Sequence, residues 1–543
     1  MKKQNKKLII FLSILIAIFT IGIIPRTFQN DTFFNIAIGK DILENGIDMK
    51  EHFCWVTDDL DYSYSHWAFD IVTYLIYNSF GFAGIYVSVI ILAIIITTTL
   101  FILLSKRTKS PIISFIITLL ISYIVRNSFT ARSQIISFLC FIVEIYCIEE
   151  FIETNKKRYA IAILLQSLLI ANFHAATWPL MLVLFMPYLA PAFLNFFSAK
   201  NIYSICINRL EKKIKRLPKD SNKLEVYQKD IEDYKKLINI PSGEYSDYKV
   251  ISKKNYNTKN LIILMILVVL SGLLTPIHGT PYTYIIKSMF GPSNFENNAS
   301  IDFVSEMKPL IPVTNLAFLV FAILFIGFLA FLPSKLKSEH GFLVIGLTLM
   351  SLMSVRYTYL LAFLGSYALS DILTYSVNLL IKDDMETLEK ITIHPICIGV
   401  LLFLFIIFTT NNLIEISNHE YVNKALYPVD AVEYIKNNLD YKNIRIFNSY
   451  DNGSYLMLNN IPVFIDSRLD VYCSEFNDTD IFYDFIKVNT GDLHYEDVFT
   501  KYNFTHILIQ KDISLNNYIS RDSNYTVLHE DDSYVLYERE LTH

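Results

Sequence analysis

The sequence predicts a mainly α-helical polytopic membrane protein, in which a transmembrane bundle of about eleven spans precedes a C-terminal extracytoplasmic α/β domain. Three observations predict this fold class. Hydrophobic residues make up 53% of the 543 residues. Uncharged apolar runs of about 17–25 residues recur along the chain, and this length matches a bilayer core. After residue 412 the hydropathy falls, and strand and helix patterns alternate to the end of the chain.

Eleven apolar segments are candidate spans of a transmembrane domain over residues 1–412. They cover residues 8–24, 84–104, 111–126, 131–152, 158–173, 176–198, 259–276, 313–332, 341–355, 357–377 and 392–411. Six basic clusters fall on one side of the membrane if residues 66–82 form an interfacial helix that does not cross. We therefore expect a cytoplasmic N-terminus, an extracytoplasmic C-terminus and, from the abundance of Ile, Asn, Lys and Tyr, a bacterial plasma membrane.

Two polar segments interrupt the predicted spans. The outer loop, residues 26–82, is rich in acids, and Phe34, Ile38 and Ile42 recur in it at helical spacing before Gly46. This pattern predicts an amphipathic helix over residues 32–45 that ends at the glycine. The second segment, residues 199–258, mixes Lys, Glu and Asp with aliphatic residues. It predicts a helical hairpin on the cytoplasmic face.

The C-terminal domain is predicted over residues 413–543. Its patterns indicate helices at 429–437 and 453–459, strands at 443–448, 462–466 and 506–510, and a final hairpin at 525–538. Asp466 and Arg468 follow the second strand, where α/β sheets commonly place ligand contacts. A loop salt bridge is the alternative for these two residues.

The predicted topology gathers many polar residues of the apolar segments and loops on the outer side. Ionisable groups at membrane depth cost about 2.5–3.5 kcal/mol each on insertion scales, so they are candidates for function unless they pair. The pattern predicts a cavity for a charged, partly lipidic substrate. The candidates are Asp31, Asp48, Glu51, His66, Arg126, Arg132, Gln134, His174, Glu306 and Arg356.

Asp31 is the first candidate for catalysis. Aspartate is a favoured N-terminal cap, which stabilises a helix by about 1 kcal/mol, so Asp31 either caps the helix at 32–45 or acts as a general base. Its place just outside the first span favours the base, because a lipid-linked substrate enters there from the bilayer.

Arg126, Arg132 and Arg356 are candidate phosphate ligands, because the guanidinium group gives two parallel charge-assisted hydrogen bonds. An interfacial anchor is the alternative for a single arginine. His174 is either a binding residue or a hydrogen-bonded structural group. The histidines have no zinc-like spacing, whereas the outer carboxylates suit a divalent cation such as Mg²⁺ or Mn²⁺.

Other features bound the function. The net charge is −5 and no basic groove is present, which argues against a nucleic-acid partner. Cys54 and Cys473 are both predicted outside and either pair or remain thiols. Glu144 lies in the middle of a span, where it either pairs with Gln166 or marks an ion path. A transporter or flippase of a lipid-linked or anionic solute is therefore the alternative to an enzyme.

Short motifs extend over most of the chain outside residues 200–260. They are Asp31-Thr-Phe-Phe, Gly39, Gly46, Phe53-Cys-Trp, His66-Trp67, Ala131-Arg-Ser-Gln, Ala171-Asn-Phe-His, Glu306 before a proline, Val355-Arg356 and Phe464-Ile-Asp-Ser-Arg. In these motifs the chain resembles the GT-C class of polytopic glycosyltransferases, the group of protein O-mannosyltransferases and aminoarabinose transferases, and above all a bacterial branch of it.

The resemblance implies an inverting transfer of a sugar from a polyprenyl-phosphate donor to a glycan, lipid or protein acceptor at the outer face. Asp31 matches the catalytic aspartate of the first loop in that class. Thr32 follows it where many members have a second acid, so Glu51 and Asp48 are the candidates for a second carboxylate. The resemblance leaves the metal open.

Overall fold

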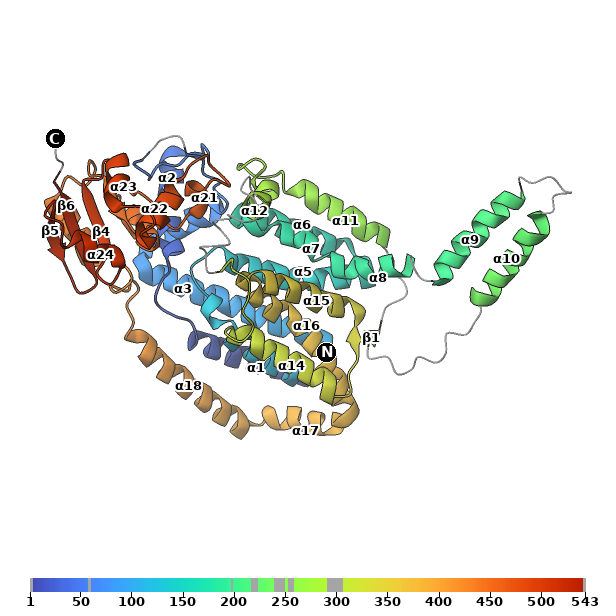
Figure 1. Cartoon of the computed structure of the whole chain (residues 1–543). Coiled ribbons are helices and arrows are strands. Elements are labelled where there is room, and N and C mark those ends of the chain that lie inside the picture. Colours follow the sequence, from blue (N-terminus) through green and yellow to red (C-terminus); the bar gives the residue numbers. More distant parts are fainter. Residues whose placement is uncertain are drawn as a thin grey trace.

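The computed structural model describes residues 3–56, 60–196, 199–215, 223–238, 250–251, 258–290 and 306–540. The chain is mostly helical, with a small sheet near its C-terminus (Figure 1). The helices of the bundle lie side by side, and the C-terminal sheet and its helices sit at one end of them. The termini of the bundle helices at that end, together with the first loop, surround the candidate site.

Most helices before the C-terminal region follow the predicted apolar segments, and one follows the predicted amphipathic helix of the outer loop. They are α1 (Lys3–Ile21), α2 (Asn30–Asn45), α3 (Trp67–Thr108), α4 (Pro111–Ile124), α5 (Gln134–Thr154), α6 (Lys157–Phe173), α7 (Pro179–Val183), α8 (Met186–Phe196), α11 (Thr258–Ser271), α12 (Thr280–Phe290), α14 (Leu316–Phe331), α15 (Ser338–Met353), α16 (Thr358–Leu380), α17 (Lys382–Thr392) and α18 (Pro395–Ser417). Three short 3₁₀ turns join them: η1 (Arg126–Ser128), η2 (Ala175–Thr177) and η3 (Val355–Tyr357).

Within the described residues, three helical segments are long and apolar enough to cross a membrane: Trp67–Thr108, Val355–Leu380 and Pro395–Ser417. Five further apolar helices are shorter. The number of spans therefore stays a prediction. The segment expected at 176–198 is divided into η2, α7 and α8, because Pro179 and Pro187 lack the amide hydrogen that continues a helix.

The predicted interfacial helix and the span after it form one helix, α3. Gly81 interrupts α3 with a φ of 62°, a conformation that glycine adopts without strain. The segment before Gly81 packs against α2, since a Cβ on Gly39 would lie 2.1 Å from the carbonyl oxygen of Asp70. Glycine at position 39 thus permits the close approach of α2 to α3.

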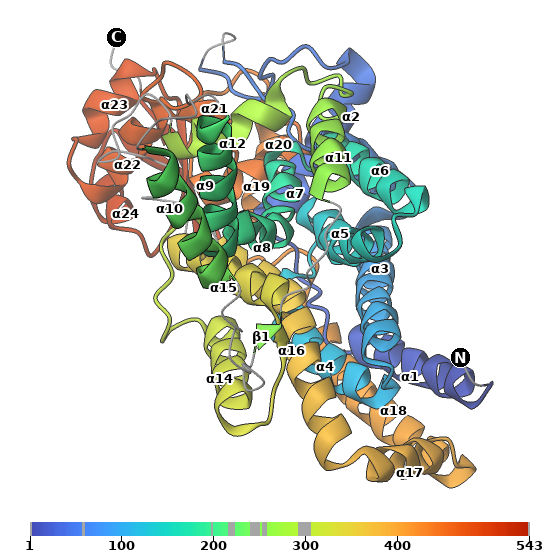
Figure 2. The same cartoon turned by 90° about the vertical axis from the view of Figure 1, so that its right-hand side faces the viewer.

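The charged insertion contains two helices among its described residues. Its helices α9 (Ala199–Ile214) and α10 (Lys223–Ile238) pack on one another and extend away from the bundle (Figure 1). Figure 2 shows the pair from the end of the molecule, in front of the other helices. The two-residue strands β1 (Val250–Ile251) and β2 (Leu336–Lys337) pair in parallel near this end.

The C-terminal region contains a sheet of four strands in the order β3-β4-β6-β5. Strand β3 is parallel to β4, and the other two neighbouring pairs are antiparallel. The elements are α19 (Val429–Asn438), β3 (Ile446–Asn448), α20 (Tyr450–Leu458), α21 (Leu469–Tyr472), α22 (Ile481–Thr490), α23 (Tyr495–Lys501), β4 (His506–Gln510), α24 (Ser514–Ile519), β5 (Tyr525–Glu530) and β6 (Tyr534–Arg539). The sequence did not predict α21 to α24.

The strand expected at 462–466 is not part of this sheet. The Asn448 side chain satisfies its backbone instead, accepting from Phe464 N at 2.9 Å and donating to Ile465 O at 2.6 Å. On the other side, Val463 forms an isolated parallel bridge with Cys54 of the first loop. The segment therefore joins the C-terminal region to the first loop.

The first loop and the C-terminal region share one apolar core. Phe34, Ile38 and Cys54 of the loop belong to the same buried cluster as the strands β3, β4 and β6. A separate cluster fills the space between the bundle helices. The first loop therefore packs against both parts: α2 contacts α20 of the C-terminal region, and its Phe33 and Ile36 belong to the bundle cluster.

A buried network of charges lies between four bundle helices. Arg107 of α3 pairs with Glu149 of α5 and, at 2.7 Å, with Asp371 of α16. His340 of α15 contacts both carboxylates, each at 2.5 Å. Arg107 is nearly buried here and links the helices.

Candidate functional site

A cavity of about 770 Å³ lies where the bundle, the first loop and the C-terminal region meet. The bundle side contributes Arg132 and Arg356, and residue 306 belongs to the connection before α14. The first loop contributes Asp31 and His66, and the C-terminal region contributes α20 to α22. Because three separate parts of the chain line it, the cavity exists only in the folded protein.

Four charged side chains form a continuous chain on the bundle side. Arg132 Nε lies 2.6 Å from Asp31 Oδ2, and Arg132 Nη1 lies 2.5 Å from Glu306 Oε1. Arg356 Nε lies 3.6 Å from the other oxygen of Glu306. Burial raises the pKa of Glu306, but the two arginines outweigh it and hold that pKa below its ordinary value. Two positive and two negative charges thus balance at this end.

Backbone contacts fix the positions of these side chains. Arg356 N donates to Glu306 O at 2.9 Å, which places the arginine of η3 beside the glutamate. Thr32 Oγ1 donates to Ala131 O at 3.3 Å, which holds the start of α2 against the residue before Arg132. The sequence predicted each of the four charges, and the fold brings them together.

Asp31 does not cap α2, so one of its two predicted roles is wrong. The N-cap is Gln29, and no side chain caps the first turn. Asp31 lies one residue inside the helix, and its carboxylate points to Arg132 with a quarter of the side chain exposed. The role of Asp31 therefore has to be sought in its contact with Arg132 in the cavity.

The same contact tests the divalent cation expected from the sequence. A metal ion shared by Asp31 and Glu306 would lie between their carboxylates, and the guanidinium of Arg132 already bonds to both. No group of three or more His, Cys, Asp or Glu side chains in the described part of the chain is arranged to hold a metal. With Arg132 between them, these residues do not fit a metal ion.

His66 also lines the cavity. Its Nδ1 lies 3.1 Å from both oxygens of Asp70, one turn further along α3, and its ring stacks on Phe34 at a centroid distance of 5.6 Å. Burial lowers the pKa of His66, but Asp70 outweighs it and raises that pKa above its ordinary value. The histidine therefore has a fixed orientation at the wall of the cavity.

Three predicted binding residues lie outside the cavity lining. Arg126 stacks on Tyr123 at 4.3 Å and donates to its carbonyl, as an interfacial anchor does. His174 is buried and its Nδ1 lies 2.9 Å from Ser137 Oγ, which suits a structural role. Gln134 begins α5 and is also absent from the lining.

The two candidates for a second carboxylate are also outside the lining. Asp48 is exposed and its Oδ2 lies 2.9 Å from His52 Nε2. Glu51 is buried and bonds to Arg468, at 2.5 Å from Oε2 to Nη1 and 2.8 Å from Oε1 to Nη2. Neither carboxylate reaches the cavity in this arrangement.

Arg468 bonds to Asp466 as well, through Nε at 2.8 Å and Nη2 at 2.6 Å. Tyr472 donates its hydroxyl hydrogen to Asp466, and Glu51 accepts from the amides of Phe53 and Cys54. Every carboxylate in this cluster has several donors. We call Glu51, Asp466, Arg468 and Tyr472 the buried charge cluster; it connects the first loop to the C-terminal region.

Two acids that were not predicted as site residues also line the cavity, Asp451 and Asp470. Burial raises the pKa of Asp451, although Asn30 donates to it at 3.4 Å. Asp470 follows Arg468 by two residues in Asp-Ser-Arg-Leu-Asp, and that run of alternating charges was the available signal. The C-terminal region thus adds two carboxylates to the lining of the cavity, to which Arg468 also belongs.

Two pairs considered from the sequence, Glu144 with Gln166 and Cys54 with Cys473, do not form among the described residues. Glu144 is buried, and neither of its oxygens nor Gln166 Oε1 has a hydrogen-bond partner among the described residues, so the expected pair of Glu144 and Gln166 does not form. Glu144 does not line the cavity. Within the same described part, no disulfide joins Cys54 to Cys473, and Cys54 Sγ instead lies 3.6 Å from Phe464 O.

No protein-family model and no curated protein matches the sequence. Solved structures do match the fold, among them three of the oligosaccharyltransferase of Archaeoglobus fulgidus. The apo enzyme has a TM-score of 0.54 at 12% identity, over 94% of this chain and 70% of the other. The AglB complex with an inhibitory peptide and a dolichol-phosphate gives 0.54 at 10%, over 96% and 71%. The form tethered to an acceptor peptide gives 0.52 at 11%, over 94% and 69%. The chain therefore shares its fold with these oligosaccharyltransferase structures.

Proposed function

We propose that the protein is a membrane glycosyltransferase, which moves a sugar from a polyprenyl-phosphate donor to an acceptor hydroxyl with inversion. The observation that supports it best is the cavity at the end of the bundle, where two arginines and two carboxylates meet. In this proposal the cavity opens to the outer face of a bacterial plasma membrane. The acceptor is a glycan, lipid or protein of the cell envelope.

The arginines suit the phosphate of the donor. As the bond between the anomeric carbon and the phosphate oxygen breaks, negative charge develops on the leaving polyprenyl phosphate. Arg132 and Arg356 line the cavity and would stabilise that charge. The two arginines are balanced by Asp31 and Glu306 before the donor binds, so the phosphate would displace part of this pairing.

The reaction also requires a proton acceptor. The acceptor oxygen forms a bond to the anomeric carbon and loses its proton to a base, a role worth typically 10²–10⁴-fold in rate. The sequence suggested Asp31 for this role. The contact with Arg132 gives Asp31 a second way to be essential, since it holds the arginine in position.

The structural neighbours support this chemistry. The archaeal enzyme is seen with a dolichol-phosphate in one complex and with an acceptor peptide in another. A lipid-phosphate carrier and a separate acceptor are the two partners that the cavity would take here. Its volume of about 770 Å³ lies in the range of sites that enclose a small molecule.

The test is turnover of a panel of polyprenyl-phosphate sugars by the purified full-length protein, with release of polyprenyl phosphate measured by mass spectrometry. Asp31→Asn should lose at least 100-fold of the wild-type rate. Asp48→Asn is the matched control, because Asp48 belongs to the same loop but lies outside the cavity. Equal rates for Asp31→Asn and wild type would remove Asp31 from the reaction.

Transport of a lipid-linked or anionic solute is the alternative function. The observation in its favour is Glu144, a buried carboxyl in a bundle helix with no hydrogen-bond partner among the described residues. Transport would require Glu144 and would leave the donor intact. Wild-type protein that consumes no donor, together with a Glu144→Gln variant that loses solute uptake in liposomes, would favour transport.

A further inference from the structure

The segment from Asp466 to Tyr472 is held rigidly against the first loop. Three of its side chains, those of Asp466, Arg468 and Tyr472, belong to the buried charge cluster and are nearly inaccessible to water. Glu51 anchors the cluster to the first loop by two bonds to Arg468. A segment fixed at both ends in this way holds the residue between them in a defined place.

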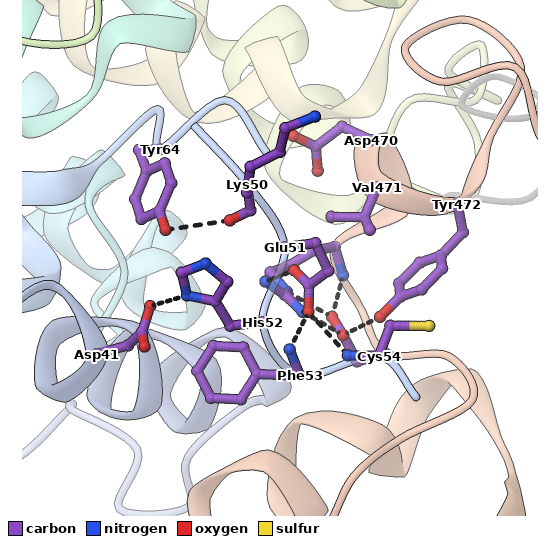
Figure 3. Close-up of polar contacts among 12 residues, drawn as sticks. Asp41, Lys50, Glu51, His52, Phe53, Cys54, Tyr64, Asp470, Val471 and Tyr472 are labelled. Carbon is purple, nitrogen blue, oxygen red and sulfur yellow. Dashed lines mark hydrogen bonds and ion pairs between the residues drawn. The ribbon is translucent and has the colours of Figure 1, made fainter. Parts of the chain in front are cut away.

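That residue is Asp470, whose carboxylate does not join the cluster. Figure 3 shows Asp470 beside the cluster with no bond to any of the residues drawn. It lines the cavity, and the described residues offer its carboxylate no ion pair. The fold thus uses three charged or polar side chains to position a fourth one at the wall of the cavity.

Asp470 shares its surroundings with Asp31. Both carboxylates line the same cavity, together with His66, Tyr284 and Tyr450. The difference between them is their partners. Asp31 is bonded to Arg132, whereas Asp470 has Arg468 and His66 nearby as charges only, with Asp466 opposing them.

We propose that Asp470 is a catalytic residue that contacts the acceptor and receives the proton of its attacking hydroxyl group. This inference rests on the proposed function and assigns the base within it. The acceptor O–H bond breaks toward Asp470, the acceptor oxygen bonds to the anomeric carbon, and the electron pair of the broken C–O bond leaves with polyprenyl phosphate. Asp31 then holds Arg132 at the phosphate.

The environment of Asp470 suits this role. Burial raises the pKa of Asp470 to about 6, against the opposing effect of Arg468 and His66. A base works best when its pKa lies near the working pH, because it is then both ionised and able to hold a proton. The C-terminal region would therefore bring the base to an acceptor whose sugar donor is bound by the bundle.

The test uses full-length protein in liposomes, the donor that wild type consumes, and glycerol as a surrogate hydroxyl acceptor. Asp470→Asn should bind donor within threefold of wild type yet transfer at least 100-fold more slowly. The wild-type rate should rise with pH around pH 6, and this rise should be absent from the residual rate of Asp470→Asn. Asp470→Glu should recover part of the rate, because it restores a carboxylate.

Asp478→Asn is the matched control, since Asp478 is exposed in the same region and is absent from the cavity lining. Each outcome decides the inference. If wild type transfers the sugar and Asp470→Asn transfers it at the same rate, the role of Asp470 is overturned and the proposed function stands. If Asp470→Asn lost both donor binding and transfer, the role of Asp470 as the base would also be overturned, because a base is not needed for binding. Wild-type protein that consumes no donor would overturn both proposals.

Discussion

Replacing Arg468 with methionine should show how strongly the buried charge cluster holds the C-terminal region to the first loop. Methionine is also long, so the main change is the loss of the guanidinium. The variant leaves Glu51 and Asp466 buried near one another without their shared cation. Breaking a buried ion pair by removing one partner typically costs about 3–5 kcal/mol.

The remaining hydrogen bonds place the expected cost at the lower end of that range. Glu51 still accepts from two backbone amides, at 2.7 and 3.1 Å, and Asp466 still accepts from the amide of residue 468 and from Tyr472. We expect a loss of about 3 kcal/mol. For a C-terminal region of roughly 130 residues this corresponds to a fall in Tm of about 10–15 °C.

Tryptophan fluorescence during heating is a suitable assay. Trp55 lies between the two parts that the cluster connects, because it belongs to the first loop and its Nε1 donates to Ile446 O at 3.2 Å. Arg521→Met is the control, since Arg521 is exposed and should tolerate the change. Adding Glu51→Gln to Arg468→Met should recover part of the loss, because it removes one of the two uncompensated charges.

If Arg468→Met lowered the Tm by less than about 4 °C, this reasoning would be refuted, since so small a change corresponds to a cost of about 1 kcal/mol or less. The cluster would then be open to water and worth no more than a surface ion pair. A double variant less stable than Arg468→Met would contradict the assignment of the cost to unpaired charge.

Four other outcomes follow from the structure. Because Arg132 supplies the positive charge between two carboxylates, a metal chelator should leave wild-type donor turnover unchanged. Arg132→Gln should lose donor binding, measured by retention of the labelled lipid. Asp470→Asn should raise the free energy of unfolding at pH 7.5 by at most about 3 kcal/mol, because the folded-state pKa of Asp470, about 6, lies above its ordinary value of 3.8. Melting curves at several pH values should show no gain below about pH 4, a gain that grows as the pH rises to 6, and a constant gain above that. Gly453→Ala should destabilise the C-terminal region by about 2–3 kcal/mol in the fluorescence assay, since its Cβ would lie 2.1 Å from Ile465 O. Glu144→Gln should keep donor turnover and Tm within error, because this carboxyl lies away from the cavity; a loss of turnover would place it in the function.

Much of the local structure could be predicted because it depends on near neighbours in the sequence. The apolar runs at 111–126 and 357–377 became α4 and α16 within a few residues, and Gly46 ended α2 as expected. The strand at 506–510 was predicted at its observed ends. Periodicity and turn residues carry this information. The strand at 462–466 failed, because a side chain and the first loop satisfy its backbone in place of a sheet neighbour.

The site shows the same division. The sequence indicated Asp31, Arg132, Glu306 and Arg356 as unusual polar residues of a membrane protein, and all four line one cavity. It did not indicate that Arg132 would bond to Asp31 rather than leave it to cap a helix. Glu51 was predicted as a candidate second carboxylate because it lies in the acid-rich first loop, but it is buried with Arg468. The partner of a charge is set by residues hundreds of positions away.

By itself the sequence determined where apolar segments lie, which polar residues interrupt them, and where an α/β pattern begins, because burial in lipid or in a core imposes a regular spacing on the chain. Only the tertiary structure decided which charges meet. Arg468 bonds to a residue 417 positions away, and Arg132 to one 174 positions away. Such pairs depend on how helices and loops pack in three dimensions, and this packing left Asp470 at the cavity without an ion-pair partner among the described residues.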